Sequence, residues 1–218
     1  MKSAFVVALL APFALAGPSQ KPLIPPPDAN VTLVPVTLGV MSRCPDAALC
    51  ETLFDDVLQR VGQKVDLGLT FIAKLNDSDE TYGVTCMHGP YECSGNIHEL
   101  CVMSRFPQET WWPFVTCLNY NGKEKIGLEG TAKKCAGVVG INWVESGVGA
   151  CVDGLEGSDL LRESVRNTTA LGIEKSCTII INGATRCIVD DGRWTQCDDG
   201  HTTKDFVDTI NKEYSKLN

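Results

Sequence analysis

The fold follows from the stretch Val34–Val61, VPVTLGVMSRCPDAALCETLFDDVLQRV, in which a strand pattern gives way to a helix pattern at a Cys-Pro pair. Residues 34–41 are mostly β-branched or apolar, as in a buried strand. Residues 45–61 carry apolar side chains at spacings of three and four, which predicts a helix packed on one face. These side chains are Leu49, Leu53, Phe54, Val57, Leu58 and Val61. Residues 65–73 alternate as a strand, so a β-α-β unit is expected.

The end of the chain predicts a hairpin. Residues 177–182 and 185–189 are strand-like runs on either side of Asn182-Gly183, a pair typical of tight hairpin turns. Two antiparallel strands are therefore expected after the β-α-β unit.

A final helix is expected to follow the hairpin, because Thr202 or Thr203 can cap a helix that runs to about Leu217. A β-α-β unit followed by a β-β-α unit is the plan of a thioredoxin-like fold. We therefore predict an α/β, thioredoxin-like domain over residues 31–218, interrupted by a cysteine-rich helical insertion at about residues 86–169.

The insertion holds six cysteines, enough to close three internal disulfides. Such bridges stabilise a small helical layer beyond what its limited core provides. The sequence leaves all fifteen pairings open. The six residues are Cys86, Cys93, Cys101, Cys117, Cys135 and Cys151.

The N-terminal segment predicts the compartment. Residues 1–16 combine Lys2 with a short apolar stretch and a small-residue cleavage site, the pattern of a secretory signal peptide. Residues 17–30 form a proline-rich lead-in. No later segment approaches the ~18 uninterrupted apolar residues of a membrane span. The mature chain is therefore expected to be lumenal or secreted, without a membrane span.

The composition of the chain limits its expected partners and compartment. The chain has 218 residues with 27 acidic against 19 basic side chains, which argues against nucleic acid as a partner. All 11 cysteines follow the leader, and an oxidising compartment pairs most of them, although an odd number leaves at least one free or shared with another chain. Glycosylation is predicted at three sequons, Asn30, Asn76 and Asn167.

The densest motif is the run Cys86–Cys101, CMHGPYECSGNIHELC. It resembles the signature of the gamma-interferon-inducible lysosomal thiol reductases, and Met87, where the family usually has Gln, is the one departure. The resemblance covers most of the chain from Val31 onward. The matching signature positions are Cys86, His88, Gly89, Glu92, Cys93, Asn96 and Cys101.

The resemblance places the chemistry at Cys44. In thioredoxin-like enzymes the nucleophilic thiol lies where the first strand meets its helix, and the helix N-terminus favours a thiolate there. Pro45 suits the first helical position. Arg43 adds a positive charge that favours the thiolate, whereas Asp46 opposes it. The alternative is that Cys44 forms half of a structural disulfide.

The chain departs from the redox members of this family at Ala47, where they carry the second, resolving cysteine of Cys-x-x-Cys. Cys50 cannot readily replace it, because six residues along a helix rise ~9 Å, beyond the ~7 Å limit on Cα separation in a disulfide. Alignment with the family puts Cys177 where thioredoxin-like folds have a cis-proline facing the nucleophile. We therefore expect Cys177 to face Cys44, either as a resolving thiol or in a locked disulfide.

The other pairings stay open. Cys177 could pair within the hairpin region, although Cys187 and Cys197 look better matched to each other. If the insertion closes three bridges and Cys44 joins Cys177, then Cys50 is the odd thiol.

Metal and cofactor sites are not expected. The signature cysteines lack the paired short knuckles of structural zinc sites, and cysteines of secreted chains are usually oxidised. His88 and Glu92 are instead expected to form hydrogen bonds that hold the turn into the insertion. His98 and His201 are isolated and are expected to be surface or hydrogen-bonded residues. No glycine loop for a nucleotide cofactor occurs.

Three functions remain open. The first is a secreted, lysosomal or vacuolar thiol-disulfide oxidoreductase that reduces protein disulfides through Cys44. The second is a redox-inactive, disulfide-stabilised binding protein of the same fold, which the loss of the resolving cysteine favours. The third is a monothiol enzyme that uses glutathione or free cysteine as reductant, as Ala47 would permit.

Overall fold

The structure, a computed structural model, describes residues 31–218. The predicted signal peptide (residues 1–16), the lead-in (residues 17–30) and the Asn30 sequon lie outside the described residues.

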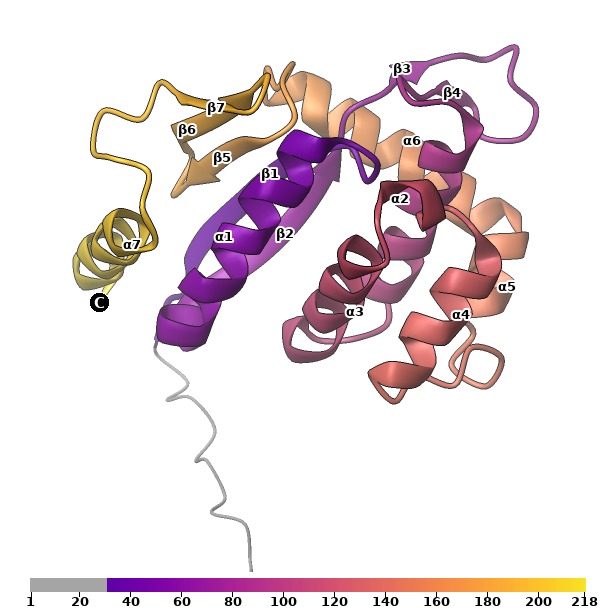
Figure 1. Ribbon diagram of the computed structural model, residues 1–218, viewed down its shortest axis with the longest axis horizontal. Coiled ribbons are helices and arrows are strands. Elements are labelled where there is room, and N and C mark those ends of the chain that lie inside the picture. The colour runs from indigo at the N-terminus through magenta and orange to yellow at the C-terminus, as the bar shows by residue number, and fades with distance from the viewer. Residues whose placement is uncertain (1–30) are drawn as a thin grey trace, which may run out of the picture. The chain divides into compact units, whose positions relative to one another are not determined.

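The described part of the chain contains a central five-stranded sheet, a small two-stranded sheet and seven α-helices (Figure 1). The elements of the first half are β1 (Val34–Val40), α1 (Pro45–Val61), β2 (Val65–Phe71), β3 (Lys74–Leu75), β4 (Val84–Thr85), α2 (Pro90–Met103) and α3 (Gln108–Tyr120). Those of the second half are α4 (Glu129–Val138), α5 (Val148–Asp153), α6 (Leu155–Ala170), β5 (Thr178–Ile181), β6 (Ala184–Asp190), β7 (Arg193–Thr195) and α7 (Thr203–Leu217).

The sheet has the strand order β2-β1-β5-β6-β7. β1 and β2 are parallel, with Val34 opposite Val65, and the other neighbouring strands are antiparallel. A β-α-β unit and a β-β-α unit thus share one sheet, and the five helices α2 to α6 lie between them in the chain. This is the predicted thioredoxin-like plan with a helical insertion.

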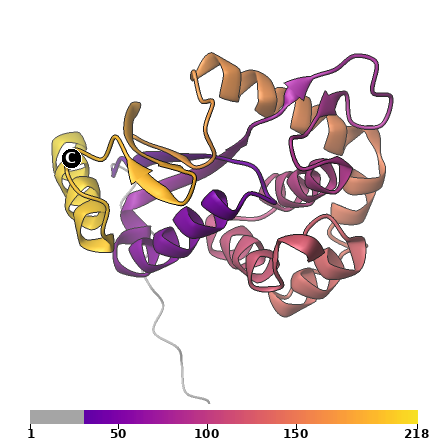
Figure 2. The ribbon, with the colours of Figure 1, turned by 45° about the horizontal axis from the view of Figure 1, so that its top comes forward.

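Side chains alternate between the two faces of the sheet, so each face packs against different helices. The face of β1 that carries Val36 and Leu38 is fully buried on the side of α1 and α7, where Phe54 meets Phe206 with ring centroids 5.3 Å apart. On the opposite face Thr70 of β2 bonds to α6, with 2.6 Å between its hydroxyl and that of Thr168. Figures 1 and 2 show the insertion beyond the β2 side of the sheet and α7 on the other side.

Local signals explain the turns and helix ends. Asn182 and Gly183 both have positive φ (49° and 79°), the conformation that a tight hairpin turn needs between β5 and β6. Thr202 caps α7: its side chain accepts from the backbone N–H of Asp205, whose carboxylate accepts from the N–H of Thr202. The small sheet of β3 and β4 was not predicted, since each strand has only two residues.

Two glycines allow close contacts of α2, Gly95 its contact with the loop that follows β1 and Gly127 its contact with the loop before α4. A Cβ at Gly95 would lie 2.6 Å from the Ser42 hydroxyl oxygen, and one at Gly127 would lie 1.9 Å from the carbonyl oxygen of Tyr91. Gly127 also has a positive φ of 84°. Any side chain there would separate the start of α2 from the loop before α4.

Candidate active site

Cys44 lies at the corner where β1 meets α1. It is the N-cap residue of α1, Pro45 is the first helical residue, and the thiol is partly exposed. Its Sγ lies 3.7 Å from the carbonyl oxygen of Ser176, in the segment that leads into β5. All eleven cysteines fall within the described residues, and Cys44 is the one that forms no disulfide. Thiol chemistry at this corner requires a free cysteine, and Cys44 is free.

The other ten cysteines form five disulfides. Three close within the insertion and one joins the strand β6 to the segment after β7. The fifth joins α1 to the segment before β5. The pairs are Cys86–Cys93, Cys101–Cys151, Cys117–Cys135, Cys187–Cys197 and Cys50–Cys177.

The expected pairing of Cys44 with Cys177, with Cys50 left over, is wrong. Cys177 is bonded to Cys50, with 6.3 Å between their Cα atoms. The reason is the orientation of α1: Ala47, Cys50 and Phe54 are all at most 1% exposed and form the face that packs inward, whereas Cys44 sits at the helix end. The spacing of these three residues was the sequence signal for this, because it places Cys50 on the buried stripe.

The segment opposite Cys44 is held by backbone contacts. The Ser176 hydroxyl accepts from the N–H of Met41 at 3.0 Å, and the N–H of Val189 donates to the carbonyl of Cys177 at 2.8 Å. The peptide bond between Ser176 and Cys177 is cis. Sequence reasoning placed Cys177 at this corner but did not identify Ser176, whose carbonyl is the group that contacts the thiol.

The two charged neighbours of Cys44 are engaged elsewhere. The guanidinium of Arg43 pairs with Glu124 at 2.8 Å and donates to the carbonyl of Lys123 at 2.8 Å, so it is directed at the insertion. The carboxylate of Asp46 accepts from the backbone N–H groups of the turn between β6 and β7, at 2.9 and 2.8 Å. Arg43 therefore fastens the start of α1 to the insertion and Asp46 fastens it to the β6–β7 turn, and the predicted effects of their charges on the thiol stay predictions.

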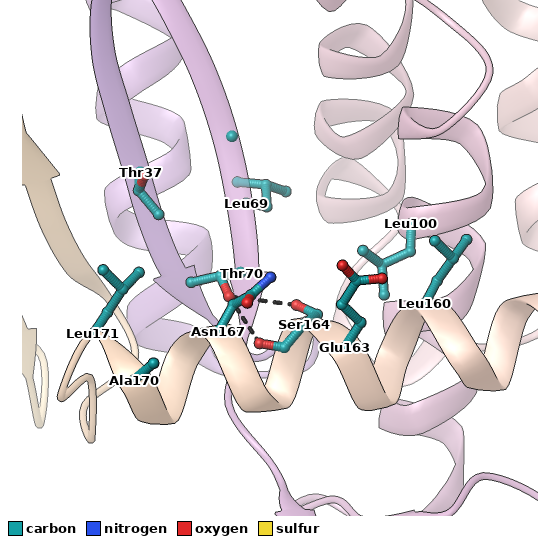
Figure 3. A pocket seen from close by; sticks show the side chains of 11 residues that line it. Thr37, Leu69, Thr70, Leu100, Leu160, Glu163, Ser164, Asn167, Ala170 and Leu171 are labelled. Carbon is teal, nitrogen blue, oxygen red and sulfur yellow. Dashed lines mark hydrogen bonds between the residues drawn. The ribbon is translucent and has the colours of Figure 1, made fainter.

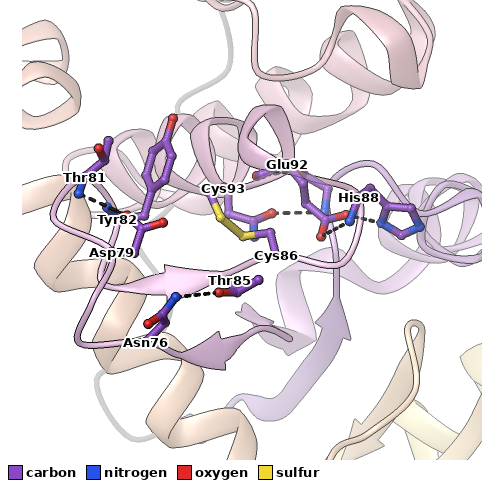
Figure 4. The surroundings of a disulfide bond; sticks show 11 residues. Asn76, Asp79, Thr81, Tyr82, Thr85, Cys86, His88, Glu92 and Cys93 are labelled. Atoms are coloured by element: carbon purple, nitrogen blue, oxygen red, sulfur yellow. Dashed lines mark hydrogen bonds and ion pairs between the residues drawn. A yellow bond between two sulfur atoms is a disulfide. The ribbon is translucent and has the colours of Figure 1, made fainter.

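The signature residues form the support beneath the Cys44 loop. The side-chain oxygen of Asn96 accepts from the N–H of Ser42 at 3.1 Å, and the Ser42 hydroxyl donates to the carbonyl of Glu92 at 3.2 Å. The Cys86–Cys93 disulfide lies close by (Figure 4), and the Asn96 amide contacts the Cys86 sulfur at 3.9 Å. The signature thus holds the loop two residues before the thiol.

His88 and Glu92 close the turn into α2, as expected. The buried Glu92 carboxylate accepts from the backbone N–H of His88 at 3.3 Å and contacts the His88 ring nitrogen Nδ1 (Figure 4). Gly89, between them, has a φ of 83° that suits glycine. Within residues 31–218 no group of three or more His, Cys, Asp and Glu side chains is arranged to hold a metal ion.

A cavity of about 350 Å³ opens beside the thiol. Its lining combines apolar and charged side chains, among them Cys44, Met87, His88, Lys175, Asp190 and Asp191. A neighbouring hollow of about 360 Å³ shares Met41, Met87 and Glu174 with it. Met87, the residue that departs from the family signature, is 75% exposed between the two.

The two predicted glycosylation sites in residues 31–218 do not line this cavity. Asn167 lines a separate hollow of about 550 Å³ between β2 and α6, which contains no cysteine (Figure 3). Asn76 donates to the Thr85 hydroxyl at 3.0 Å on the β3–β4 loop. Glycosylation at Asn76 and Asn167 stays a prediction.

The two remaining histidines differ from each other. His201 is exposed and stacks on Trp194, with ring centroids 5.6 Å apart. His98 is only 1% exposed, its Nδ1 has no hydrogen-bond partner, and burial lowers its pKa to about 4. The expectation of a surface or hydrogen-bonded residue is therefore wrong for His98, because α2 buries this side chain against Trp143.

Two carboxyl groups, one on α1 and one on α2 of the insertion, are buried. Glu51 of α1 is 2% exposed and accepts from the Asn119 side chain of α3 at 2.6 Å. Burial raises its pKa to about 7, and the Asn119 hydrogen bond partly opposes this. Glu99 of α2 is 1% exposed, and burial, followed by repulsion from Glu51, raises its pKa well above the ordinary value.

These carboxyls predict that acidic conditions stabilise the fold. The folded protein keeps the Glu51 proton at pH values where the unfolded chain releases it, so this contribution is complete below pH ~4.5 and is lost as the pH rises to about 7. The Glu51→Gln variant removes this loss and keeps an oxygen that accepts from Asn119. Its free energy of unfolding, relative to wild type, should increase by about 3 kcal/mol between pH 4.5 and 8 in urea titrations.

Glu80→Gln is the matched control, since Glu80 is exposed on a loop. It should change the unfolding free energy equally at both pH values. An equal pH dependence for wild type and Glu51→Gln would contradict the role of the buried carboxyl.

The comparisons with known proteins agree with this geometry. Residues 35–139 match the sequence model of the family described as gamma interferon inducible lysosomal thiol reductase (GILT). The chain is 29% identical over 154 residues to GILT-like protein 1 of Drosophila melanogaster, which covers 63% of this chain and 60% of the relative. It is also 29% identical over 99 residues to the gamma-interferon-inducible lysosomal thiol reductase of Carassius auratus, covering 45% of this chain and 38% of the relative. Each match therefore spans less than two thirds of the relative.

Solved structures share the fold. BdbD from Bacillus subtilis superposes with a TM-score of 0.59 at 14% identity, over 84% of this chain and 88% of that one. MdbA of Corynebacterium diphtheriae, a thiol-disulfide oxidoreductase, gives a TM-score of 0.58 at 16% identity, over 84% and 85%. The predicted thioredoxin-like fold is confirmed. Among the described helices, none has the length and apolar character needed to cross a membrane.

Proposed function

We propose that this protein, whose residues 35–139 match the sequence model of the gamma interferon inducible lysosomal thiol reductase family, is a thiol-disulfide oxidoreductase that reduces protein disulfides through Cys44. The observation that carries the proposal is the state of the cysteines. Ten are oxidised in pairs, and the eleventh is a partly exposed thiol at a helix N-terminus beside a cavity. A thiol in that position can be reached by a substrate.

The reaction begins with attack of the Cys44 thiolate on one sulfur of a substrate disulfide. This step forms a mixed disulfide and releases the other substrate sulfur as a thiolate. Ala47 is buried at the position of the usual resolving cysteine, so a small thiol such as glutathione or free cysteine releases the mixed disulfide in this proposal. This proposal combines two functions predicted from the sequence, the reductase that acts through Cys44 and the monothiol enzyme that uses an external thiol.

The surroundings of Cys44 suit a polypeptide substrate. The exposed Met87 offers apolar contact in the cavity that Cys44 lines, and Asp190 and Asp191 line the same cavity. An unfolded chain presents both apolar side chains and backbone groups to such a surface. Five disulfides are typical of an oxidising compartment, and the lumen of the secretory pathway or lysosome, or the exterior, is the proposed location.

A redox-inactive binding protein is the second candidate. The observation that favours it is that neither residue 47 nor Cys177 offers a free resolving thiol, since the first is alanine and the second is oxidised.

The two candidates separate in one experiment. The purified mature chain is mixed with a denatured protein that has one disulfide, at pH ~4.5 and ~7, with and without glutathione, and quenched with iodoacetamide. We expect glutathione-dependent reduction and, without glutathione, a mixed disulfide that mass spectrometry locates at Cys44. The same substrate with its cysteines blocked is the control. Absence of both products, while Cys44 still reacts with iodoacetamide, would favour the binding protein.

A further inference from the structure

Cys44, Cys50 and Cys177 lie close to one another near the start of α1, and Cys44 is the one with a free thiol. The Sγ of Cys44 is 3.7 Å from the carbonyl oxygen of Ser176, and a single peptide bond links Ser176 to Cys177. Cys177 is in turn bonded to Cys50, about 1.7 turns further along the helix that Cys44 caps. The free thiol and this disulfide therefore belong to one corner of the molecule.

Accessibility separates the three residues. Cys50 and Cys177 have no exposed surface, whereas Cys44 is partly exposed and lines the cavity described above. Thiol-disulfide exchange requires a thiolate to reach a sulfur directly. A small thiol in solvent can reach the sulfur of Cys44, but in the folded protein it cannot reach the other two.

We propose that Cys50–Cys177 is the second redox centre of this site and that Cys44 is the residue through which it exchanges with solvent and substrate. This inference rests on the proposed function, because Cys44 must first react with a disulfide. It assigns the resolving role, lost at Ala47, to two cysteines that are far apart in the sequence.

The electrons move in two exchanges when the pair is reduced. The Cys177 thiolate attacks the Cys44 sulfur of the mixed disulfide, the bond between Cys44 and the substrate breaks, and the substrate leaves as a thiolate that takes a proton from water. The Cys50 thiolate then attacks the Cys177 sulfur, and Cys44 leaves as a thiolate. In total, the Cys50 and Cys177 thiols lose two electrons and the substrate disulfide gains them.

The observed cysteine pairing is the end state of this sequence. Cys44 is free and Cys50–Cys177 is closed, so the nucleophile is ready although the resolving pair is oxidised. In this state the chain can still act with an external thiol, as proposed above.

Resetting the pair uses the same route in reverse. The Cys44 thiolate attacks the Cys177 sulfur and releases the Cys50 thiolate. A small thiol then attacks Cys44, which frees the Cys177 thiolate, and a second small thiol frees Cys44 while the two small thiols leave as their disulfide. Both electrons come from the small thiol.

The first test is the rate at which glutathione reduces each disulfide in the native full-length mature chain, followed by alkylation and mass spectrometry. In the Cys44→Ala variant we expect Cys50–Cys177 to be reduced at least about tenfold more slowly than in wild type. The Cys187–Cys197 disulfide, whose Cys197 is partly exposed, is the internal control and should react equally in both proteins. Equal rates for Cys50–Cys177, or no reduction of it in wild type, would overturn the proposal.

The second test follows a single turnover. Wild-type chain with Cys50 and Cys177 reduced is freed of small thiol and given the one-disulfide substrate. We expect released substrate thiols and a re-formed Cys50–Cys177 bond, and the Cys50→Ala variant should stop at a Cys44–Cys177 disulfide. A persistent mixed disulfide at Cys44 in wild type would overturn the relay but leave the reductase function standing. No mixed disulfide and no substrate reduction would overturn both.

Discussion

Replacement of Cys44 by serine is expected to abolish disulfide reduction, lowering the rate at least about a thousandfold. The hydroxyl of serine is not ionised at pH 4.5 to 7 and cannot form a disulfide with the substrate, so the first exchange is lost rather than slowed. The measurement is the initial rate of reduction of a one-disulfide protein in the presence of glutathione, corrected for the rate with glutathione alone.

The fold should be unaffected by this change, which makes the loss interpretable. Cys44 forms no disulfide, and its one polar contact in the described structure is the long one between Sγ and the Ser176 carbonyl oxygen. The midpoint of urea unfolding is therefore the control and should match that of wild type. Residual activity within tenfold of wild type would exclude Cys44 as the nucleophile and direct attention to the five disulfides themselves.

Removal of the Cys101–Cys151 disulfide is expected to give a large loss of stability. The bond links α2 to α5 across 50 residues, and both sulfurs lie in the fully buried part of the insertion. A closed loop of that length restricts the unfolded chain by about 4 kcal/mol. The double variant Cys101→Ala/Cys151→Ala should lose about that much free energy of unfolding in denaturant titrations.

The matched control is Cys187→Ala/Cys197→Ala, which opens a loop of only 10 residues at the hairpin. The same relation gives about 3 kcal/mol there. Hydrogen exchange distinguishes the two variants further: the first should lose protection in α5 and α6, and the second in β6 and β7. A larger loss in the hairpin variant would mean that packing, rather than loop closure, determines the contribution of these bonds.

The regular parts of the fold could be predicted because their signals are local. The helix over residues 45–61 follows from the spacing of its apolar side chains and from Pro45 at its start, and the structure has the same bounds. The Asn182-Gly183 turn and the Thr202 cap each depend on residues within a few positions of one another. The predicted order of strands and helices therefore agrees with the structure, apart from the short strands β3, β4 and β7, which were not predicted.

The candidate site could be predicted only in part. The corner position of Cys44 follows from the same local pattern, but the partner of Cys177 depends on which face of α1 packs against the segment before β5. Cys50 and Cys177 are 127 residues apart, and no local rule relates them. The spacing of Ala47, Cys50 and Phe54 places Cys50 on the buried face of α1. This spacing was the signal that could have identified Cys50 as the partner of Cys177.

Charges were harder to predict than positions. The sequence shows Arg43 next to the thiol, but only the folded chain brings Glu124 within 2.8 Å of its guanidinium. In the same way, the sequence shows Asp46 as an acidic residue in the first turn of α1. In the structure its carboxylate accepts hydrogen bonds from the backbone of the β6–β7 turn. The contribution of a charged side chain depends on its partners, and these come from elements distant in the chain.

The odd cysteine count gives the native protein a single point of attachment. A maleimide dye or a nitroxide spin label would couple at Cys44 with a stoichiometry of one, without mutagenesis, because the other cysteines are already bonded to each other. The label would lie in the cavity that is lined by Met87 and by Asp190 and Asp191. One attached reporter could therefore record how these two segments respond when a polypeptide approaches.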